Sequence, residues 1–327
     1  MRTSCLLTVG ALLAVAHAGA RDIGELRPLA VIKVGATADW VAPADDAVWV
    51  GSTGPDAVQR VDPADNRITD RIGLPGEPCA GLALGFGSLW VPLCPRVAGT
   101  PTSLARVDLA SRRLLAVYPT GVAAAEGGIA ISGGSVWLLT DAEGTLAGLD
   151  PATGQLRHTV HVPAGSYNPH DADGALWVTQ AGGTHVTRID PLSGAVGAPV
   201  TVGAQPRFLT SGAGALWILQ QGDGRVARVD LSTFSIEHIA LHTPGHGGDI
   251  AYAEGYVWSS MPKTPLSLID AASHRLLCQW RGAGGDSLGV KFGAIWLTDY
   301  HRGTLSRLDR AEALRRCQSP PRALHGR

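Results

Sequence analysis

Apolar and polar residues follow one another along this chain in an order that repeats seven times. Each repeat centres on a tryptophan between apolar residues, which predicts a short buried strand. The seven triplets are Val48-Trp49-Val50, Leu89-Trp90-Val91, Val136-Trp137-Leu138, Leu176-Trp177-Val178, Leu216-Trp217-Ile218, Val257-Trp258-Ser259 and Ile295-Trp296-Leu297. Successive tryptophans are 41, 47, 40, 40, 41 and 38 residues apart. A period of this length is typical of a repeat protein.

Each repeat contains the material for four strands. A small apolar segment such as Ile129-Ala130-Ile131 comes first, followed by a Gly-containing turn, the Trp strand and a polar loop. A third strand such as Val226 to Val229 and an alternating fourth such as Ala195 to Val202 complete the unit. Four short strands in about 40 residues, without a helical period, form one blade of a propeller. The sequence therefore predicts an all-β fold, a seven-bladed β-propeller of four-stranded antiparallel blades.

The two ends of the repeat array predict how the ring closes. The seventh copy runs out after Asp309 without a fourth strand, because Arg310 to Arg316 is strongly charged. The segment Leu29 to Val34 matches a fourth strand but has no blade in front of it. We expect this N-terminal strand to complete the last blade, so that neither sheet edge stays free. The propeller then spans residues 21–310, and residues 311–327 form a C-terminal tail.

An aspartate follows each Trp strand, in most copies 13 residues after the tryptophan. The seven are Asp62, Asp108, Asp150, Asp190, Asp230, Asp270 and Asp309. Several stand at the head of turn sequences such as Asp150-Pro151-Ala152-Thr153-Gly154, where a carboxylate accepts backbone N–H groups of its own turn. Seven equivalent acids spread around a ring cannot form one active site. We therefore interpret them, and the repeated tryptophans, as structural.

Residues 1–20 have the features of an export signal. Arg2 is followed by an apolar run from Cys5 to Val15, and then by small residues at spacings that suit a signal peptidase. A membrane anchor is the alternative, but it needs about 20 apolar residues. We expect a periplasmic or secreted protein without a membrane span.

Charge limits the classes of partner. Loss of Arg2 with the signal lowers Lys and Arg from 27 to 26, against 28 Asp and Glu. A nearly neutral chain without a basic run argues against nucleic acids and anionic membranes as partners. We expect a monomer that binds a small polar molecule or another protein.

Four of the five cysteines remain after the signal, and an even number in an oxidising compartment favours disulfides. The repeat register places Cys79 and Cys94 on one face of blade 2, which predicts a Cys79–Cys94 bond. A second bond, Cys278–Cys317, is compatible with the register. Metal binding by these cysteines is disfavoured because the chain has no Cys-x-x-Cys motif.

The repeat pattern (apolar-Trp-apolar, Arg-apolar-Asp-Pro-x-x-Gly, then Val-Gly) resembles two related groups of propellers. One group is the YVTN-type repeat proteins of the bacterial periplasm. The other is the virginiamycin B lyase family, whose members open cyclic streptogramin B antibiotics by elimination with Mg²⁺. The resemblance runs from Leu29 to Asp309 and implies the fold more strongly than the activity.

The lyase resemblance implies a catalytic His in a Pro-His segment ten residues before the repeat Trp. In this chain those positions hold Asp39, Ala80, Gly127, Tyr167, Arg207, Gly248 and Asp286. None is His, and the pair Pro169-His170 lies three residues too late in its blade. Elimination would lack its proton acceptor at the matched place. The sequence leaves open whether the protein is an enzyme; the alternative is a metal-assisted lyase or lactonase with His170 as the base.

Blade 4 departs from the other blades in its innermost strand. Most of these strands are built from Gly, Ala, Leu, Ile and Ser, whereas this one contains Tyr167, Asn168, Pro169, His170 and Asp171. Polar groups beside the central channel need partners, water or ligand, so we expect a site there. Two structural alternatives remain: a local repair of one blade, or a core His bonded to a neighbouring group.

Other polar residues fall on the loops of the same rim. From the loops between blades come Asp39, Glu126, Arg207, His246, Asp249 and Asp286. From the loops after the Trp strands come Asp141, Gln180, Gln220, Asp299, Tyr300 and His301. Arg207 and Asp286 join the blade 4 residues as ligand-binding candidates, and the acids suit a Mg²⁺ or Ca²⁺ ion at the channel mouth. We therefore expect an exported propeller that binds a small polar ligand or a protein partner at this mouth.

Overall fold

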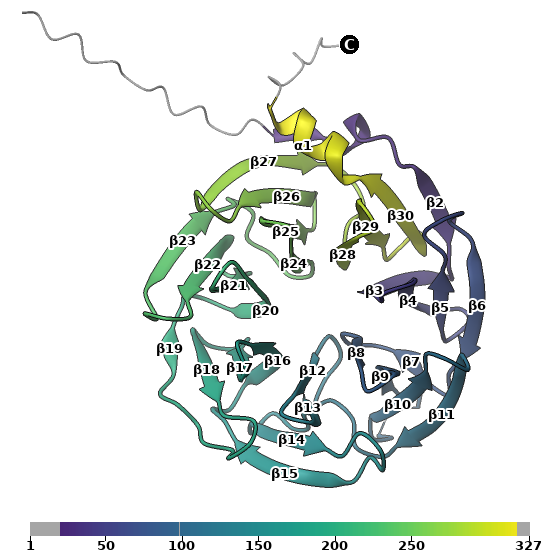
Figure 1. The fold of residues 1–327 in the computed structure, drawn as a ribbon, viewed down its shortest axis with the longest axis vertical. Helices are drawn as coiled ribbons and strands as arrows, with labels where there is room; N and C mark the ends of the chain where they lie inside the picture. The colour runs from purple at the N-terminus through teal and green to yellow at the C-terminus, as the bar shows by residue number, and fades with distance from the viewer. Residues whose placement is uncertain (1–19, 98, 319–327) are drawn as a thin grey trace, which may run out of the picture.

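Seven sheets stand around a central axis in the structure, a computed structural model that describes residues 20–97 and 99–318 (Figure 1). Blade 1 contains β3 (Thr37–Pro43), β4 (Val48–Thr53), β5 (Ala57–Val61) and β6 (Ile68–Gly73). Blade 2 contains β7 (Glu77–Pro78), β8 (Ala83–Gly85), β9 (Ser88–Cys94), β10 (Ser103–Asp108) and β11 (Arg113–Tyr118). Blade 3 contains β12 (Ile129–Ser132), β13 (Ser135–Leu139), β14 (Thr145–Leu149) and β15 (Leu156–His161).

The second half of the ring follows the same plan. Blade 4 contains β16 (Ser166–Ala172), β17 (Ala175–Gln180), β18 (His185–Ile189) and β19 (Val200–Thr201). Blade 5 contains β20 (Pro206–Gly212), β21 (Ala215–Gln220), β22 (Arg225–Asp230) and β23 (Ile236–Ala240). Blade 6 contains β24 (Asp249–Ala253), β25 (Tyr256–Met261), β26 (Thr264–Asp270) and β27 (Arg275–Arg281). Blade 7 contains β28 (Leu288–Lys291), β29 (Ala294–Asp299), β30 (Thr304–Asp309) and β2 (Ala30–Lys33). The predicted all-β, seven-bladed propeller is confirmed.

The core lies between neighbouring blades. All seven repeat tryptophans are at most 1% exposed. Trp177 on β17, for example, packs in one cluster with Leu216 and Ile218 of the next blade. Burying one large aromatic per blade stabilises each interface, because the hydrophobic effect scales with the apolar area removed from water. The structural role predicted for these residues is confirmed.

The repeated aspartates hold their own turns. The Oδ1 atom of Asp150 accepts the backbone N–H groups of Ala152 at 2.7 Å and Thr153 at 2.9 Å. Backbone hydrogen bonds of this kind lower the pKa of Asp150. The same bonds recur after Asp190 and Asp270, so the predicted turn role is confirmed.

The ring closes as the sequence predicts. Strand β2 pairs antiparallel with β30, with Ala30 opposite Arg307 and Lys33 opposite Thr304. The backbone N–H of Leu29 extends this ladder by donating to the carbonyl of Arg307 at 2.8 Å. Blade 7 therefore takes its outer strand from the N-terminus.

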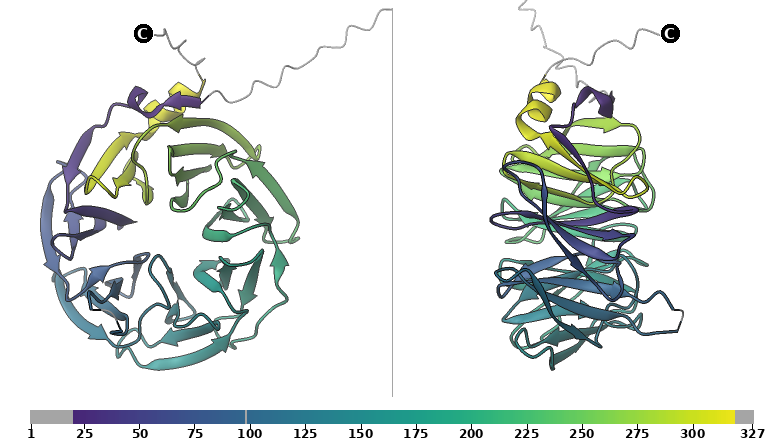
Figure 2. Two further views of the ribbon diagram at one scale, coloured as in Figure 1. Left: turned by 180° about the vertical axis from the view of Figure 1, so that it is seen from behind. Right: turned by 90° about the vertical axis from the view of Figure 1, so that its right-hand side faces the viewer.

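Both ends of the described chain add a layer that the repeat did not predict. Strand β1 (Ala20–Asp22) pairs parallel with β27, and the 3-10 helix η1 (Ile23–Glu25) follows it. Where a tail was expected, the helix α1 (Arg310–Gln318) begins directly after β30. Figures 1 and 2 show both terminal segments at the same edge of the ring. The predicted signal segment, apart from Ala20, lies outside the described residues.

Both predicted disulfides are present, each with its Cα atoms 5.6 Å apart. Cys278–Cys317 joins β27 to α1, and Cys79–Cys94 joins the residue that follows β7 to the last residue of β9. No helix in residues 20–97 and 99–318 has the length and hydropathy to cross a membrane.

Candidate functional site

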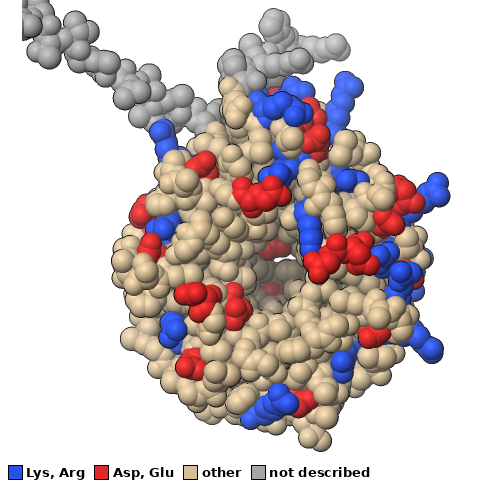
Figure 3. Space-filling model, in the orientation of Figure 1, with Lys and Arg blue, Asp and Glu red and all other residues tan. Residues whose placement is uncertain are grey.

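The central channel widens into two cavities along its length. The mouth chamber, about 400 Å³, is lined by Asp39, Glu77, Pro78, Cys79, Ala125, Glu126, Pro262, Lys263, residues 282–286, Asp299, Tyr300 and His301. The inner chamber, about 450 Å³, is lined mainly by the innermost strands. Between them a neck of about 10 Å³ is bordered by Asp39, Trp40, Glu126, Phe208, Gly247, Gly248, Asp286 and Ser287. Figure 3 shows the ring hollowed at its centre, with acidic side chains inside the opening.

Three carboxylates from three separate segments line the channel where the mouth chamber narrows into the neck. Asp39 belongs to β3, Glu126 to the loop between β11 and β12, and Asp286 to the loop between β27 and β28. Asp39 and Asp286 both stand ten residues before a repeat tryptophan, which places them in the same layer of the channel. Their proximity follows directly from the propeller's symmetry.

Two of these carboxylates are poorly compensated. Burial raises the pKa of Asp39 well above its usual value, and the nearby charge of Asp286 raises it further. The one hydrogen bond that opposes this comes from the backbone N–H of Trp40, at 2.8 Å. Burial also raises the pKa of Asp286, whose carboxylate accepts a long 3.4 Å bond from Gly248 N–H. The ionised forms of these two carboxylates are therefore poorly compensated by their surroundings.

Trp40 forms the floor of this acidic layer. It is the extra residue of a β-bulge, because Asp39 pairs with Gly51 and Val41 with Val50 while Trp40 has no partner on β4. Its φ of 42° is rare for a residue with a large side chain. The bulge directs the indole into the channel, where its ring centroid lies 5.9 Å from that of Phe208 in blade 5.

Sequence reasoning missed Trp40, although the repeat register contains a signal for it. Trp40 and Phe208 stand nine residues before a repeat tryptophan, and blades 2 and 3 have Gly81 and Gly128 at this position. Gly81 lies beside the indole, since a Cβ atom built on it would stand 3.8 Å from the Trp40 ring, which is an ordinary van der Waals contact.

At the mouth, blade 4 and blade 5 form a closed polar network. Arg207 pairs with Glu126 and donates from Nη2 to the hydroxyl of Tyr167 at 2.9 Å. The Tyr167 hydroxyl donates in turn to the carbonyl of Ala125. The Arg207 guanidinium also stacks 4.7 Å from the centroid of the Tyr167 ring. The structure thus brings Tyr167 and Arg207 together as expected, but with Glu126 already as their partner.

The other blade 4 candidates lie deeper. Asn168 donates to the carbonyl of Arg207 at 2.8 Å, and its side chain lines the inner chamber. The Nε2 atom of His170 lies 2.9 Å from Ser211 Oγ, and Asp171 accepts from Ser132 Oγ at 2.5 Å. Asp286 borders the mouth chamber and the neck, whereas His170 lines only the inner chamber. The six candidates therefore do not form one cluster.

His170 is a weaker base than its residue type suggests. Burial lowers its pKa from 6.5 to about 4, a shift that the neighbouring Asp171 opposes. The cause is desolvation, which disfavours the charged imidazolium. A catalytic role for His170 stays a prediction.

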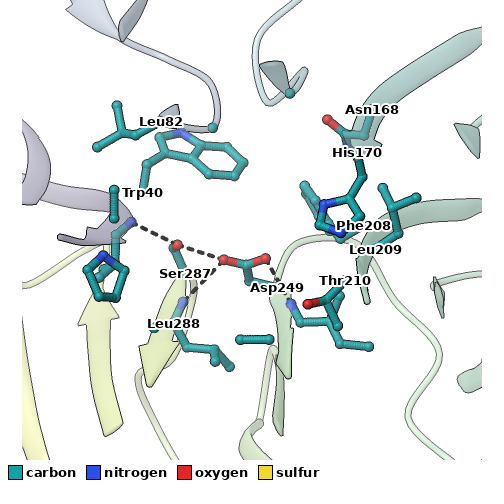
Figure 4. A pocket seen from close by; sticks show the side chains of 18 of the residues that line it. Trp40, Leu82, Asn168, His170, Phe208, Leu209, Thr210, Asp249, Ser287 and Leu288 are labelled. Carbon is teal, nitrogen blue, oxygen red and sulfur yellow. Dashed lines mark hydrogen bonds between the residues drawn. The ribbon is translucent and has the colours of Figure 1, made fainter. Parts of the chain in front are cut away.

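Asp249 and Ser287 form a polar bridge in the wall of the inner chamber. Ser287 Oγ donates to Asp249 Oδ2 at 2.8 Å and accepts from the Val41 N–H at 3.1 Å. Burial raises the pKa of Asp249 to about 6 despite these bonds. Figure 4 shows Trp40 and His170 on opposite sides of this chamber, with the bridge between Asp249 and Ser287 below them. The remaining wall is mostly apolar, including Leu82, Leu209 and Leu288.

The structure offers no ready ligand set for a metal. Within the described part of the chain, no group of three His, Cys, Asp or Glu side chains is placed to hold a metal ion. The Mg²⁺ or Ca²⁺ expected at the mouth stays a prediction.

Comparison with known proteins supports the fold and nothing finer. No family model matches the chain, and no curated protein matches it by sequence. Among solved structures, BamB from Moraxella catarrhalis is similar with a TM-score of 0.63 and 14% identity, over 87% of this chain and 97% of that chain. The computationally designed protein Ika8 is similar with a TM-score of 0.61 and 14% identity, over 85% of this chain and 97% of that chain. At such identity the likeness shows the propeller alone.

Proposed function

We propose that this protein is an exported β-propeller that binds a small cationic molecule in its mouth chamber. The observation that carries the proposal is the charge of the lining. Five acids (Asp39, Glu77, Glu126, Asp286 and Asp299) face two basic residues, Lys263 and His301. Arg207 pairs with Glu126 and Arg302 lies 3.7 Å from Asp299, which leaves Asp39, Glu77 and Asp286 in excess over Lys263. A concave site lined by one sign of charge concentrates ligands of the opposite sign.

The raised pKa values of Asp39 and Asp286 support this assignment. A carboxylate whose pKa is raised by burial and by a like charge is stabilised when a cation arrives. Asp39 has one backbone donor and Asp286 one long bond, so both retain oxygen lone pairs for a ligand. The chamber, at about 400 Å³, has the size of a small-molecule site.

Export is supported by the cysteines. Two disulfides in a chain of this size are typical of oxidising compartments, and they agree with the signal-like sequence of residues 1–20. A periplasmic or secreted protein would meet small cations directly.

A thermal-shift screen tests the proposal. The full chain is heated at pH 7.5 with choline, putrescine or agmatine, and with acetate or citrate at equal ionic strength. A ligand present at 100 times its Kd stabilises the folded state by about 2.7 kcal/mol, which raises Tm by roughly 5 °C or more. We expect this shift from at least one of the amines and from neither anion.

Two variants identify the site. Asp286→Asn should remove most of the shift, because it deletes one of the two poorly compensated charges. Asp173→Asn is the matched control, since Asp173 is exposed at the turn between β16 and β17 and does not line the mouth chamber. Equal shifts with the anions, or an unchanged shift in Asp286→Asn, would contradict the proposal.

A further inference from the structure

We infer that the inner chamber is a second binding site, which takes a small, neutral aromatic alcohol. Its volume of about 450 Å³ is within the range of small-molecule sites. The neck separates it from the mouth chamber, and with about 10 Å³ the neck has room for roughly one water molecule. The inference therefore does not depend on the cation proposed for the mouth chamber.

The walls of the inner chamber favour an aromatic ring as the body of the ligand. Trp40 and Phe208 line the chamber with their ring centroids 5.9 Å apart, and Tyr252 adds a third aromatic side chain. Leu82 and Leu288 are among the aliphatic residues of the same wall. An aromatic ligand that displaces water from these surfaces gains from the hydrophobic effect and from ring–ring contacts.

Charged ligands are disfavoured, because the acid and the lysine that line this chamber already have partners. The Oδ2 atom of Asp249 accepts hydrogen bonds from Ser287 Oγ at 2.8 Å and from the Leu288 N–H at 3.3 Å. Lys291 Nζ lies 2.7 Å from Asp45 Oδ1. A charge placed between the apolar walls would lose its hydration without finding a free counter-charge. A neutral ligand avoids this cost.

His170 supplies the polar contact for the hydroxyl group of the ligand. Figure 4 shows its imidazole on the chamber wall opposite Trp40. The Nε2 atom lies 2.9 Å from Ser211 Oγ, and in the described part of the chain no group forms a hydrogen bond with Nδ1. Burial keeps the imidazole neutral at pH 7 by lowering its pKa, so one ring nitrogen is a donor and the other an acceptor. A hydroxyl group both donates and accepts, and it therefore fits Nδ1 in either tautomer.

An NMR titration of the full chain at pH 7.5 with three related probes tests the inference. 4-Ethylphenol has the ring and the hydroxyl group, ethylbenzene has the ring alone, and 4-ethylbenzoate has a negative charge in place of the hydroxyl group. Trp40 is the one tryptophan among the lining residues, so its indole N–H resonance, identified by its loss in Trp40→Phe, reports occupancy. We expect 4-ethylphenol to shift this resonance and to bind about fivefold more tightly than ethylbenzene, which is the effect of one net hydrogen bond. 4-Ethylbenzoate should bind at least tenfold more weakly than 4-ethylphenol, since its charge is desolvated.

Three variants connect binding to the chamber and to the imidazole. Leu82→Trp should abolish binding of 4-ethylphenol and ethylbenzene, because Leu82 packs against the cluster that contains Trp40 and Phe208, and a larger side chain there fills the chamber. Leu29→Trp is the matched control, since Leu29 is 56% exposed just before β2 and does not line the chamber. His170→Phe should lower the affinity for 4-ethylphenol to that for ethylbenzene, about fivefold, and leave ethylbenzene binding unchanged.

Circular dichroism and Tm establish that each variant is folded. If His170→Phe does not fold, the nitrogen NMR shifts of the imidazole in the wild-type protein replace it. 4-Ethylphenol should then change the Nδ1 shift of His170, and ethylbenzene should leave it unchanged.

Several results would overturn the inference. A Trp40 resonance that does not respond to 4-ethylphenol would mean that the chamber takes no aromatic alcohol. Equal affinities for 4-ethylphenol and ethylbenzene, or a preference that persists in His170→Phe, would mean that the imidazole does not recognise the hydroxyl group. Binding of 4-ethylphenol that persists in Leu82→Trp would place the ligand outside the chamber. If the amines fail to bind while 4-ethylphenol binds as expected, the function proposed for the mouth chamber fails and this inference stands.

Discussion

Blade 4 and blade 1 both place polar residues in their innermost strands, but the carboxylate in blade 1 is less well compensated than the polar groups in blade 4. In β16, Asn168 is bonded to the Arg207 carbonyl and His170 to Ser211. In β3, the Asp39 carboxylate has a single backbone donor and faces Asp286, a like charge. A polar residue in a strand is thus a poor indicator of a site by itself. An uncompensated one is a better indicator, because its desolvation cost is removed only by a ligand.

The largest effect that we expect from this difference between the blades is a pH dependence of stability caused by His170 in blade 4. Its folded-state pKa of about 4 lies below the unfolded value of 6.5, so the unfolded state binds a proton first as pH falls. The stability that it contributes is present above pH 6.5 and is lost as pH decreases towards 4. Between pH 7 and 4.5, wild type should lose roughly 2–3 kcal/mol more than His170→Gln.

Urea unfolding of both proteins at the two pH values measures this difference. Equal losses in the two proteins would show that His170 is not a buried, neutral member of the core. Asp39 and Asp249 titrate in the opposite direction in both proteins, so their contributions cancel in the comparison.

The next effect concerns Asn168, which is 4% exposed. Asn168→Ala removes the 2.8 Å bond to the Arg207 carbonyl, which keeps a second donor in Thr179 Oγ1 at 2.9 Å. We expect a loss of about 1–2 kcal/mol in the free energy of unfolding, with no change in ligand-induced thermal shift. A loss of the ligand-induced thermal shift with unchanged stability would indicate that the ligand binds at blade 4 instead.

The charged residue of blade 1, Asp39, should have the opposite effect: its charge should lower the stability of the folded protein as pH rises. The folded-state pKa of Asp39 is raised above the unfolded value of 3.8. Ionisation of this carboxylate therefore costs stability, and the cost begins as pH rises above 3.8. Asp39→Asn retains the acceptor for the Trp40 N–H and removes the charge. We expect Tm to rise by roughly 2–4 °C at pH 8 and to stay unchanged at pH 3.5, measured by circular dichroism. A lower Tm at pH 8 would mean that the charge is compensated in the unliganded protein.

The ring could be predicted from the sequence because its causes are local and repeated. The tryptophan register fixes seven blades, and the unmatched segment Leu29 to Val34 fixes the closure with β30. The disulfide Cys79–Cys94 follows from the same register. Strand β1 and helix α1 lie outside the repeat, so nothing in the periodicity predicts where they pack.

The candidate site was less predictable, because a residue's partners come from other blades. Sequence reasoning selected Tyr167 and Arg207 correctly as neighbours but could not show that Glu126 pairs with Arg207. It named Asp39 and Asp286 among the rim acids without showing that the charge of Asp286 raises the pKa of Asp39. Trp40 was overlooked because a bulge, which the repeat pattern does not reveal, turns it into the channel.

The central claim is that an incoming cation is met by the uncompensated acids of blades 1 and 7, and proton release tests it most directly. Choline is titrated into the protein at pH 6 in two buffers with different ionisation enthalpies. A cation beside Asp39 and Asp286 lowers their pKa values, so binding should release protons, and the observed heat should differ between the buffers. The account predicts that this difference shrinks in Asp39→Asn and persists in His170→Gln. Equal heats in both buffers for wild type, or a difference abolished only by His170→Gln, would contradict it.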